Sequence, residues 1–243
     1  SDAFTGSLVR ETGENVGTYE IQQGSVALNS NYTLTYVPAD YTITLRAIEI
    51  TADGKTKVYG EDDEALTFQI TDGSLAFSDA FTGSLVRETG ENVGTYEIQQ
   101  GSVALNSNYT LTYIPADYTI TLRAIEITAD ARTKVYGEDD EALTFQITDG
   151  SLAFSDAFTG SLVRETGENV GTYEIQQGSV ALNSNYTLTY VPADYTITLR
   201  AIEITADGKT KVYGEDDEAL TFQITDGSLA FSDAFTGSLV RET

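Results

Sequence analysis

Hydrophobic and polar residues alternate along most of this chain with a period of two, which is the period of a β-strand. Between residues 66 and 122, apolar side chains occupy every second position within several short runs. Turn-forming Gly, Asn, Asp and Pro separate these runs. The apolar sets are Leu66, Phe68 and Ile70; Tyr96 and Ile98; Val103 and Leu105; Tyr109, Leu111 and Tyr113; and Tyr118, Ile120 and Leu122.

The same pattern recurs along the sequence every 77 residues. The hexapeptide SDAFTG begins at residues 1, 78, 155 and 232, so the 243 residues hold three copies and the first 12 residues of a fourth. The first and third copies are identical, and such close copies indicate recent duplication and a task that depends on the number or length of domains. The second copy differs only by Ile114 in place of Val37, Ala131 in place of Gly54 and Arg132 in place of Lys55.

Each copy is predicted to contain seven or eight short strands, which indicates an all-β fold, either a small β-sandwich or a β-grasp-like sheet. No stretch of ten or more residues shows the period of a helix. One short helical turn is expected over residues 61–65, where acidic side chains lie near the first free amides. The turn at Asp53 and Gly54 should not need a left-handed residue, because Ala131 occupies the same position in the second copy.

The segment of residues 118–129 (YTITLRAIEITA) contains no Gly, Pro or Asn and predicts one continuous strand. Its apolar phase changes partway, because Tyr118 and Ile120 are even-numbered whereas Ile125 and Ile127 are odd-numbered. Such a slip turns the apolar set to the other face, so the first half should face one domain and the second half the next. A β-bulge inside one domain is the alternative. The predicted domains are the C-terminal part of a repeat (1–46), two complete repeats (47–123 and 124–200) and the N-terminal part of a repeat (201–243).

The predicted domain limits lead to expectations for the joint between repeats and for the two ends of the chain. Twelve residues of strand span roughly 40 Å, and no flexible linker separates the repeats, which predicts a stiff array joined end to end. The sequence begins and ends within a repeat, so we expect an internal piece of a longer protein. Apolar strand edges should then be exposed at both ends, unless the array continues or residues 1–46 and 201–243 of neighbouring molecules complete each other.

Charge and composition exclude several classes of function. The sequence has 13 Lys and Arg against 38 Asp and Glu, a net charge of −25, which disfavours binding to nucleic acids and to anionic membranes. No apolar run is long enough for membrane insertion. The absence of His and Cys removes the most common general base and a common nucleophile, so we predict a protein that is not an enzyme.

The acidic run of residues 61–64 (EDDE) is the main candidate for chemistry, and its first interpretation is a solvated loop. A calcium site is the alternative, formed in the second copy by Glu138, Asp139, Asp140 and Glu141 together with Asp130, although the D-x-D-x-D-G spacing is missing. An isopeptide bond would need a buried Lys57, yet its position beside Lys55 indicates the exposed side of a hairpin. We therefore predict no catalytic, cofactor-binding or metal-binding residues, with calcium as the one cofactor considered.

Five Tyr residues per copy suggest sugar-stacking platforms as one interpretation. Tyr96, Tyr109, Tyr113 and Tyr118 lie in phase with apolar positions, however, which favours packing in or beside the core. Residues 31–33 (NYT) also match a glycosylation sequon, which has meaning only in an organism that uses it.

Three groups of residues resemble the MBG/YDG-type repeats of bacterial surface adhesins. They are residues 57–61 (KVYGE), residues 90–98 (GENVGTYEI) and the Asn108-Tyr109-Thr110 element before residues 118–120. The resemblance covers every copy and implies secreted cell-surface proteins with long repeat arrays, active in adhesion or biofilm. It supplies no catalytic residues. Within the motif we expect Gly94 to provide a conformation or close approach that a side chain would hinder, and Tyr96 to enter the core.

The leading hypothesis is a structural stalk that projects an adhesive region from a bacterial surface. The first alternative is a polyvalent module in which each copy weakly binds a host or matrix glycan or protein. The second is a self-assembling extracellular filament or surface-layer subunit. Neighbouring repeats of the same protein are the expected partners in every case.

Overall fold

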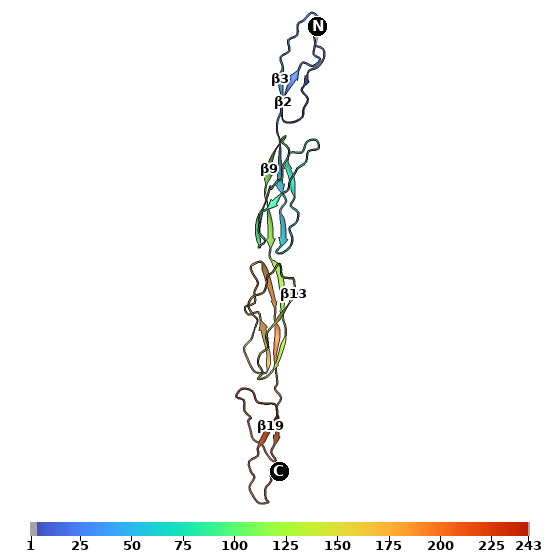
Figure 1. Cartoon of the computed structure of the whole chain (residues 1–243). Coiled ribbons are helices and arrows are strands. Elements are labelled where there is room, and N and C mark those ends of the chain that lie inside the picture. The colour runs from blue at the N-terminus through green and yellow to red at the C-terminus, as the bar shows by residue number, and fades with distance from the viewer. Residues whose placement is uncertain (1–3, 243) are drawn as a thin grey trace. The chain divides into compact units, whose positions relative to one another are not determined.

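The computed structural model describes residues 4–242, and within that range the regular structure is all strand with no helix (Figure 1). The predicted all-β class is therefore confirmed. The helical turn expected over residues 61–65 is wrong, because a turn forms at residues 59–60 instead. The Glu61 amide donates to the Val58 carbonyl at 3.0 Å, and the Glu61 carboxylate accepts from the Val58 amide at 3.1 Å. The Glu61 side chain therefore caps the strand that ends at Val58 and does not begin a helix.

The chain forms two compact units, residues 1–121 and residues 122–243. The complete repeat of the first unit contains β4 (Arg46–Ala52), β5 (Lys55–Val58), β6 (Phe68–Asp72), β7 (Val86–Arg87), β8 (Gly94–Gln99), β9 (Tyr109–Ile114) and β10 (Ala116–Thr121). One sheet has the order β6-β4-β9 and the other the order β5-β10-β8-β7. Two small sheets form the repeat, as the sandwich alternative requires.

The first and last segments of the repeat lie side by side and run parallel. Arg46 lies opposite Tyr109 where β4 pairs with β9, and Val58 lies opposite Thr121 where β5 pairs with β10. Partners are offset by 63 positions at both points, so the two ladders share one register. We call these segments, residues 46–58 and 109–121, the terminal strand pair.

The second unit repeats this arrangement with β11 (Arg123–Ala129), β12 (Arg132–Val135), β13 (Phe145–Asp149), β14 (Val163–Arg164), β15 (Gly171–Gln176), β16 (Tyr186–Val191) and β17 (Ala193–Thr198). The sheet orders are β13-β11-β16 and β12-β17-β15-β14. Arg123 lies opposite Tyr186 and Val135 opposite Thr198, which gives the same parallel register for its terminal strand pair, residues 123–135 and 186–198.

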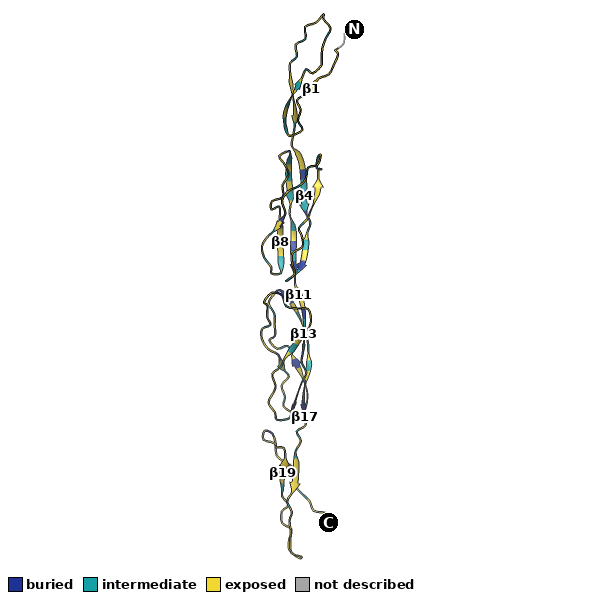
Figure 2. Ribbon diagram, turned by 45° about the vertical axis from the view of Figure 1, so that its right-hand side comes forward, coloured by how far each residue is buried: buried dark blue, intermediate teal, exposed yellow. Residues whose placement is uncertain are grey.

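Both sheets contribute to the core, because alternate apolar side chains on their strands are removed from water. Figure 2 shows the buried residues within the two complete repeats. Tyr113 of β9 links the two sheets, since its hydroxyl donates to the Ile98 carbonyl of β8 at 2.5 Å. The fully buried side chains of the first complete repeat include Ile48 and Ile50 of β4, Ile98 of β8, and Tyr118 and Ile120 of β10; those of the second include Ile125, Ile127, Ile175, Tyr195 and Ile197.

The predicted continuous strand over residues 118–129 is wrong at one residue, because β10 ends at Thr121 and β11 begins at Arg123. The predicted change of phase is confirmed: Ile120 is buried in β10, and Ile125 is buried in β11. The two strands belong to different sheets, so the slip is not a bulge within one ladder. Leu122, 47% exposed, is the residue at which the chain changes from one set of strand partners to another. The exact domain limits stay a prediction.

The outer segments contain fewer strands than the complete repeats. Residues 4–45 form β1 (Val9–Arg10), β2 (Gly17–Gln22) and β3 (Ala39–Ile43), and residues 201–242 form β18 (Glu203–Ala206) and β19 (Phe222–Asp226). No described residue before Ile48 is buried, and Ala230 is the one buried residue described after residue 200 (Figure 2). The expected exposure of apolar strand edges at both ends is confirmed for the described residues.

The turn at residues 53–54 behaves as predicted, since neither Gly54 nor Ala131 has a positive φ. Among the described residues other than glycine, positive φ occurs at Phe77, Phe154 and Phe231, with values of 53°, 52° and 51°. An L-residue seldom adopts this conformation. The alternation pattern gave no sign of it.

Candidate functional site: the ion-pair cluster and the repeat joint

Four charged residues form what we call the ion-pair cluster of the first complete repeat. Lys57 lies on β5 and Arg87 on β7, whereas Asp63 and Glu91 come from the loops that follow those strands. The Lys57 Nζ lies 2.6 Å from Asp63 Oδ1 and 2.6 Å from Glu91 Oε2. Arg87 Nε lies 2.6 Å from Asp63 Oδ2, and Arg87 Nη2 also pairs with Glu91. Two cations and two anions thus join four separate chain segments.

Lys57 is only 5% exposed, so its predicted place on the exposed side of a hairpin is wrong. The reason lies in the pairing of β5: Lys57 is opposite Ile120 on the core strand β10, and its side chain therefore points inward. A buried ammonium group is costly unless anions and hydrogen bonds compensate it. Asp63 and Glu91 provide that compensation.

The same contacts keep the cluster ionised. The fork of Arg87, with help from Lys57, outweighs burial and lowers the pKa of the Asp63 carboxyl to about 2. Burial by itself would lower the pKa of Lys57, but its hydrogen bonds with Asp63 and Glu91 raise that pKa instead. A Lys–Asn isopeptide bond forms when a neutral lysine amine attacks an asparagine carboxamide and ammonia leaves, so an ammonium paired with two carboxylates favours the ion pair over that bond.

Arg87 also stacks on two aromatic rings, with its guanidinium carbon 5.4 Å from the Tyr96 ring centre and 5.1 Å from that of Tyr118. A Cβ at Gly90, where φ is +151°, would come within 2.3 Å of the Tyr96 ring, whereas a Cβ at Gly94 would keep 3.9 Å. The expectation for Gly94 is therefore wrong, and Gly90 is the glycine that permits the close approach.

The four Tyr residues were predicted to pack in or beside the core. Tyr118 is 0% exposed, and Tyr96, Tyr109 and Tyr113 are half-buried.

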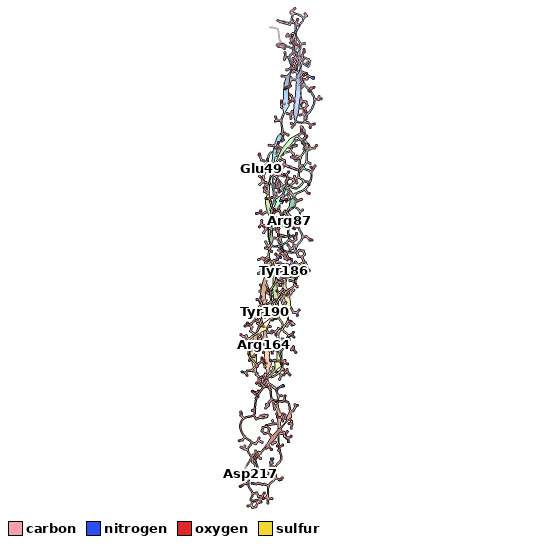
Figure 3. The ribbon with its side chains drawn as sticks, turned by 60° about the vertical axis from the view of Figure 1, so that its left-hand side comes forward. Glu49, Arg87, Arg164, Tyr186, Tyr190 and Asp217 are labelled. Carbon is pink, nitrogen blue, oxygen red and sulfur yellow. The ribbon has the colours of Figure 1, made fainter. Side chains whose placement is uncertain are left out.

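The second complete repeat contains the same cluster. Lys134 lies 2.6 Å from Asp140 and 2.5 Å from Glu168, and Arg164 pairs with both carboxylates. Figure 3 labels Arg87 and Arg164, the two arginines of the clusters. Asp63 and Asp140 belong to the acidic loop that was predicted to be solvated, so part of that loop forms ion pairs instead. Among residues 4–242, no group of three or more acidic side chains has an arrangement suited to a metal ion.

The joint between consecutive repeats involves Asn108 in the first unit. Its side-chain Oδ1 accepts from the Val16 amide at 2.8 Å, and its Nδ2 donates to Asn15 Oδ1 at 3.0 Å. The Asn108 carbonyl accepts from the Arg46 amide at 2.9 Å, which begins the terminal strand pair. Asn108, one of the motif residues, therefore connects the strand pair of its own repeat with the preceding segment.

In the second unit, the Tyr-Gly pair of the KVYGE motif contacts the segment that follows the complete repeat. The ring of Tyr136 lies edge-on to Phe231, with centres 5.5 Å apart, and a hydrogen bond with Asp233 raises the pKa of Tyr136. A Cβ at Gly137, where φ is +84°, would lie 2.2 Å from the Cβ of Ala230, so only glycine fits there. The sequence identified Tyr136 and Gly137 as motif residues but gave no sign of their partners.

Each complete repeat also has a shallow, open depression beside the ion-pair cluster. The first, of about 570 Å³, is lined by Arg87, Glu88, Thr89, Thr95, Tyr96 and Gln99. The second, of about 580 Å³, is lined by the equivalent residues of the next repeat, Arg164 to Gln176 in sequence order.

The sequence matches the family model of the MBG domain (YGX type) over residues 1–42, 48–119 and 125–196. Repeat domains of this kind are associated with adhesin-like surface proteins. No curated protein is significantly similar to the chain. No solved structure matches it either. Across the described residues, the fold includes no helix with the length and apolar character needed to cross a bilayer.

Proposed function

Because this chain belongs to the family of MBG domains of the YGX type, we propose that it is a load-bearing stalk segment of an adhesive extracellular surface protein. The task of each repeat is to transmit tension between a surface and an adhesive region without unfolding. No part of this task requires a catalytic residue, a cofactor or a metal ion.

The terminal strand pair is the observation that carries the proposal. The chain enters a complete repeat at Arg46 and leaves it at Thr121, and these residues lie at opposite ends of two adjacent parallel segments. Tension applied along the chain would slide the segments past each other. Backbone hydrogen bonds of a parallel ladder run across the strands, so such sliding loads many bonds together rather than one after another.

The ion-pair cluster supports the same function. It connects β5 of the terminal strand pair with β7 and with the loop after it, through Lys57, Asp63, Arg87 and Glu91. Because Lys57 is buried and Arg87 pairs with both carboxylates, removal of either residue would leave charges of the cluster without a partner, which would destabilise the repeat. The joint contacts of Asn108 in the first unit, and of Tyr136 and Gly137 in the second, would limit hinge motion between repeats.

Single-molecule force spectroscopy tests this proposal, and the absence of Cys allows handles at chosen pairs of engineered cysteines. Handles at Leu45→Cys and Leu122→Cys pull the terminal strand pair in shear. Handles at Asp62→Cys and Leu122→Cys hold the same end of both segments and peel them apart. The three positions are exposed, so both variants should keep the native stability. We expect a rupture force several times higher in the shear geometry, with a length gain of at most about 270 Å per repeat.

Equal rupture forces in the two geometries would contradict the load-bearing role. The comparison depends on direction alone, because both variants contain the same fold and the same strand pair.

The shallow depressions favour a second candidate function, polyvalent binding of glycans. Each presents a half-buried Tyr beside Arg and Gln side chains, and the two occur at equivalent places in consecutive repeats. Stacking on Tyr with hydrogen bonds from Arg and Gln suits a sugar ring, and repetition would supply avidity. Titration of the chain with mucin and matrix glycans, compared with the variant Gln99→Ala and Gln176→Ala, tests it. An unchanged or absent response would leave the stalk as the function.

A further inference from the structure

A phenylalanine in a strained backbone conformation recurs in every copy of the repeat. Phe77, Phe154 and Phe231 have φ values of 53°, 52° and 51°, a region that a bulky L-residue seldom adopts. Their side chains are 85%, 68% and 69% exposed, so burial in a core does not compensate for the strain. Strain of this kind persists only where the surrounding structure holds it, and it is concentrated at functional sites. Its recurrence indicates a task for the exposed ring.

Each strained phenylalanine is the second residue of a short turn, which we call the phenylalanine turn (residues 76–79, 153–156 and 230–233). In all three copies the amide of the Asp that ends the turn donates to the carbonyl of the Ala that begins it, at 3.1 Å. In the first complete repeat the Tyr109 hydroxyl accepts from the Ala76 amide at 2.8 Å and donates to Asp79 at 2.7 Å. Asn106 also donates to Asp79, at 2.8 Å.

The second complete repeat holds its phenylalanine turn with the same set of contacts. The Tyr186 hydroxyl, labelled in Figure 3, accepts from the Ala153 amide at 2.8 Å and donates to Asp156 at 2.7 Å. Asn183 donates to Asp156 at 2.9 Å. Because these partners all belong to the same repeat as the turn, the conformation of the turn is established before any neighbouring repeat contacts it.

The second unit contains the contacts that a phenylalanine turn makes with the repeat before it. Phe231 lies edge-on to Tyr136, and the Tyr136 hydroxyl forms a hydrogen bond with Asp233. Ala230 is 7% exposed and occupies the space beside Gly137, where a Cβ would lie only 2.2 Å from its own. A ring contact, a hydrogen bond and a close approach at glycine thus act together, and their combination fits a Tyr-Gly pair.

We propose that the phenylalanine turn is an interaction surface whose partner is the Tyr-Gly pair of the preceding repeat, and that this contact fixes the angle between the two repeats. The inference rests on the proposed stalk function and names the surface that makes a joint stiff. The strained φ holds the ring outside the core of its own repeat, where it meets the tyrosine. Neighbouring domains move relative to each other unless an interface restrains them, and this contact is the restraint.

Distances between two nitroxide labels test the proposal in the full chain, which has no Cys of its own. The labels are attached at Thr172→Cys on β15 and at Asp226→Cys on β19, two exposed positions on either side of the joint. We expect a narrow distance distribution by double electron–electron resonance when the joint residues are unchanged. Phe231→Gly removes the ring but adopts a positive φ without strain, so the turn is kept. It should broaden the distribution about twofold or more.

Tyr136→Ala removes the other ring of the pair and changes no residue of the turn. It should broaden the distribution as much as Phe231→Gly does. The double variant should be no broader than either single variant, because both changes remove the same contact.

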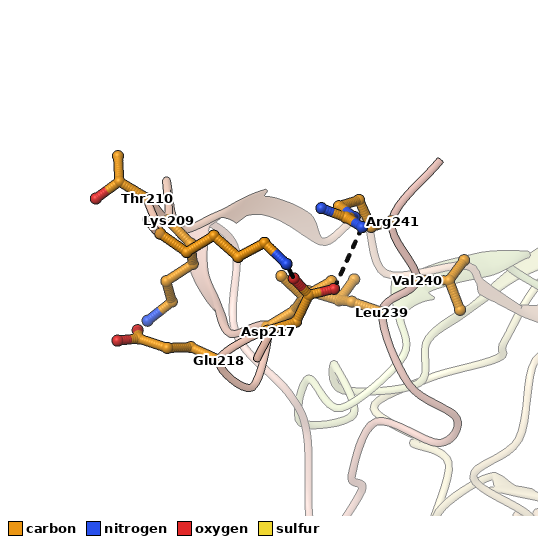
Figure 4. A pocket seen from close by; sticks show the side chains of 9 residues that line it. Lys209, Thr210, Asp217, Glu218, Leu239, Val240 and Arg241 are labelled. Atoms are coloured by element: carbon orange, nitrogen blue, oxygen red, sulfur yellow. Dashed lines mark ion pairs between the residues drawn. The ribbon is translucent and has the colours of Figure 1, made fainter. Parts of the chain in front are cut away.

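Two control variants change the segment that follows the joint at positions away from the turn. Phe235→Ala removes a ring that lies edge-on to Phe222, with centres 4.9 Å apart. Asp217→Asn removes the carboxylate that pairs with Lys211 and Arg241 beside a cavity of about 540 Å³ (Figure 4). Both controls should keep the narrow distribution.

A broad distribution with unchanged joint residues, an unchanged width in Phe231→Gly, or equal broadening in the controls would overturn the proposed contact. The stalk function is judged separately, by the rupture forces of the repeat at residues 46–121. A high shear force together with a broad distribution would retain the stalk and refute the contact at the phenylalanine turn. Equal rupture forces together with a narrow distribution would refute the stalk and retain the contact.

Discussion

Replacement of Ile127 by Ala tests how burial in the terminal strand pair stabilises a repeat. Ile127 lies on β11, is 0% exposed, and is placed opposite Tyr190 on β16 and Ile147 on β13. Truncation removes buried apolar atoms and leaves a cavity, which should cost about 2–5 kcal/mol. Ile204 has the same neighbours in sequence but is 43% exposed, because no parallel strand covers it. Ile204→Ala should therefore cost less than about 1 kcal/mol.

Urea unfolding followed by tyrosine fluorescence provides the assay, since the sequence has 15 Tyr and no Trp. The protein concentration is kept low enough that the chain is monomeric. For a urea slope of about 2 kcal/mol per M, the midpoint of the repeat spanning residues 123–198 should fall by roughly 1–2.5 M. The repeat spanning residues 46–121 keeps its Ile50, so one transition should divide into two of similar amplitude. An equal effect of Ile127→Ala and Ile204→Ala would refute the reasoning from burial.

Two further predictions concern the ion-pair cluster of the first complete repeat. Gly90→Ala should destabilise that repeat by about 2 kcal/mol or more, because its Cβ would meet the Tyr96 ring at a positive φ, whereas Gly94→Ala should change stability little; urea midpoints of the two variants check this difference. The pKa of Asp63 falls from 3.8 to about 2 on folding, so its ion pairs stabilise the repeat above about pH 4 and are lost as pH falls through 2. Asp63→Asn should lower stability at pH 7 by about 1 kcal/mol, after allowance for the 40% exposure of the side chain, and should flatten the decline of stability between pH 4 and pH 2. A decline as steep as that of the unmodified chain would contradict the role of Asp63, and Asp62→Asn in the same loop is the control.

Much of the fold was predictable because alternation reports directly on which side of a strand meets water. The alternation over residues 118–122 predicted buried Tyr118 and Ile120, and the phase change predicted that Ile125 and Ile127 face a different core. The ion-pair cluster was not predictable in this way. Lys57, Asp63, Arg87 and Glu91 are distributed over 34 positions of the chain, and their charges look like ordinary solvated groups until strand pairing turns Lys57 inward.

The contacts at the joint could not be predicted from the sequence for a related reason. The Tyr136-Gly137 pair carried a family signature, but its partners Ala230 and Phe231 lie almost a hundred positions away. A periodic pattern records which residues are apolar, not which distant residues they meet. Spacing between repeats gives no information about such contacts, because each copy presents the same side chains.

The period of 77 residues, the all-β class and the face of each strand follow from the sequence, since these depend on local alternation and on turn residues. Tertiary structure alone decided whether a given segment becomes a strand at all. Residues 55–58 and residues 209–212 share their composition and their neighbours, yet only the former are a strand, because β10 lies beside them. A β-strand cannot satisfy its backbone hydrogen bonds within itself, so its formation depends on a partner that the local sequence does not contain.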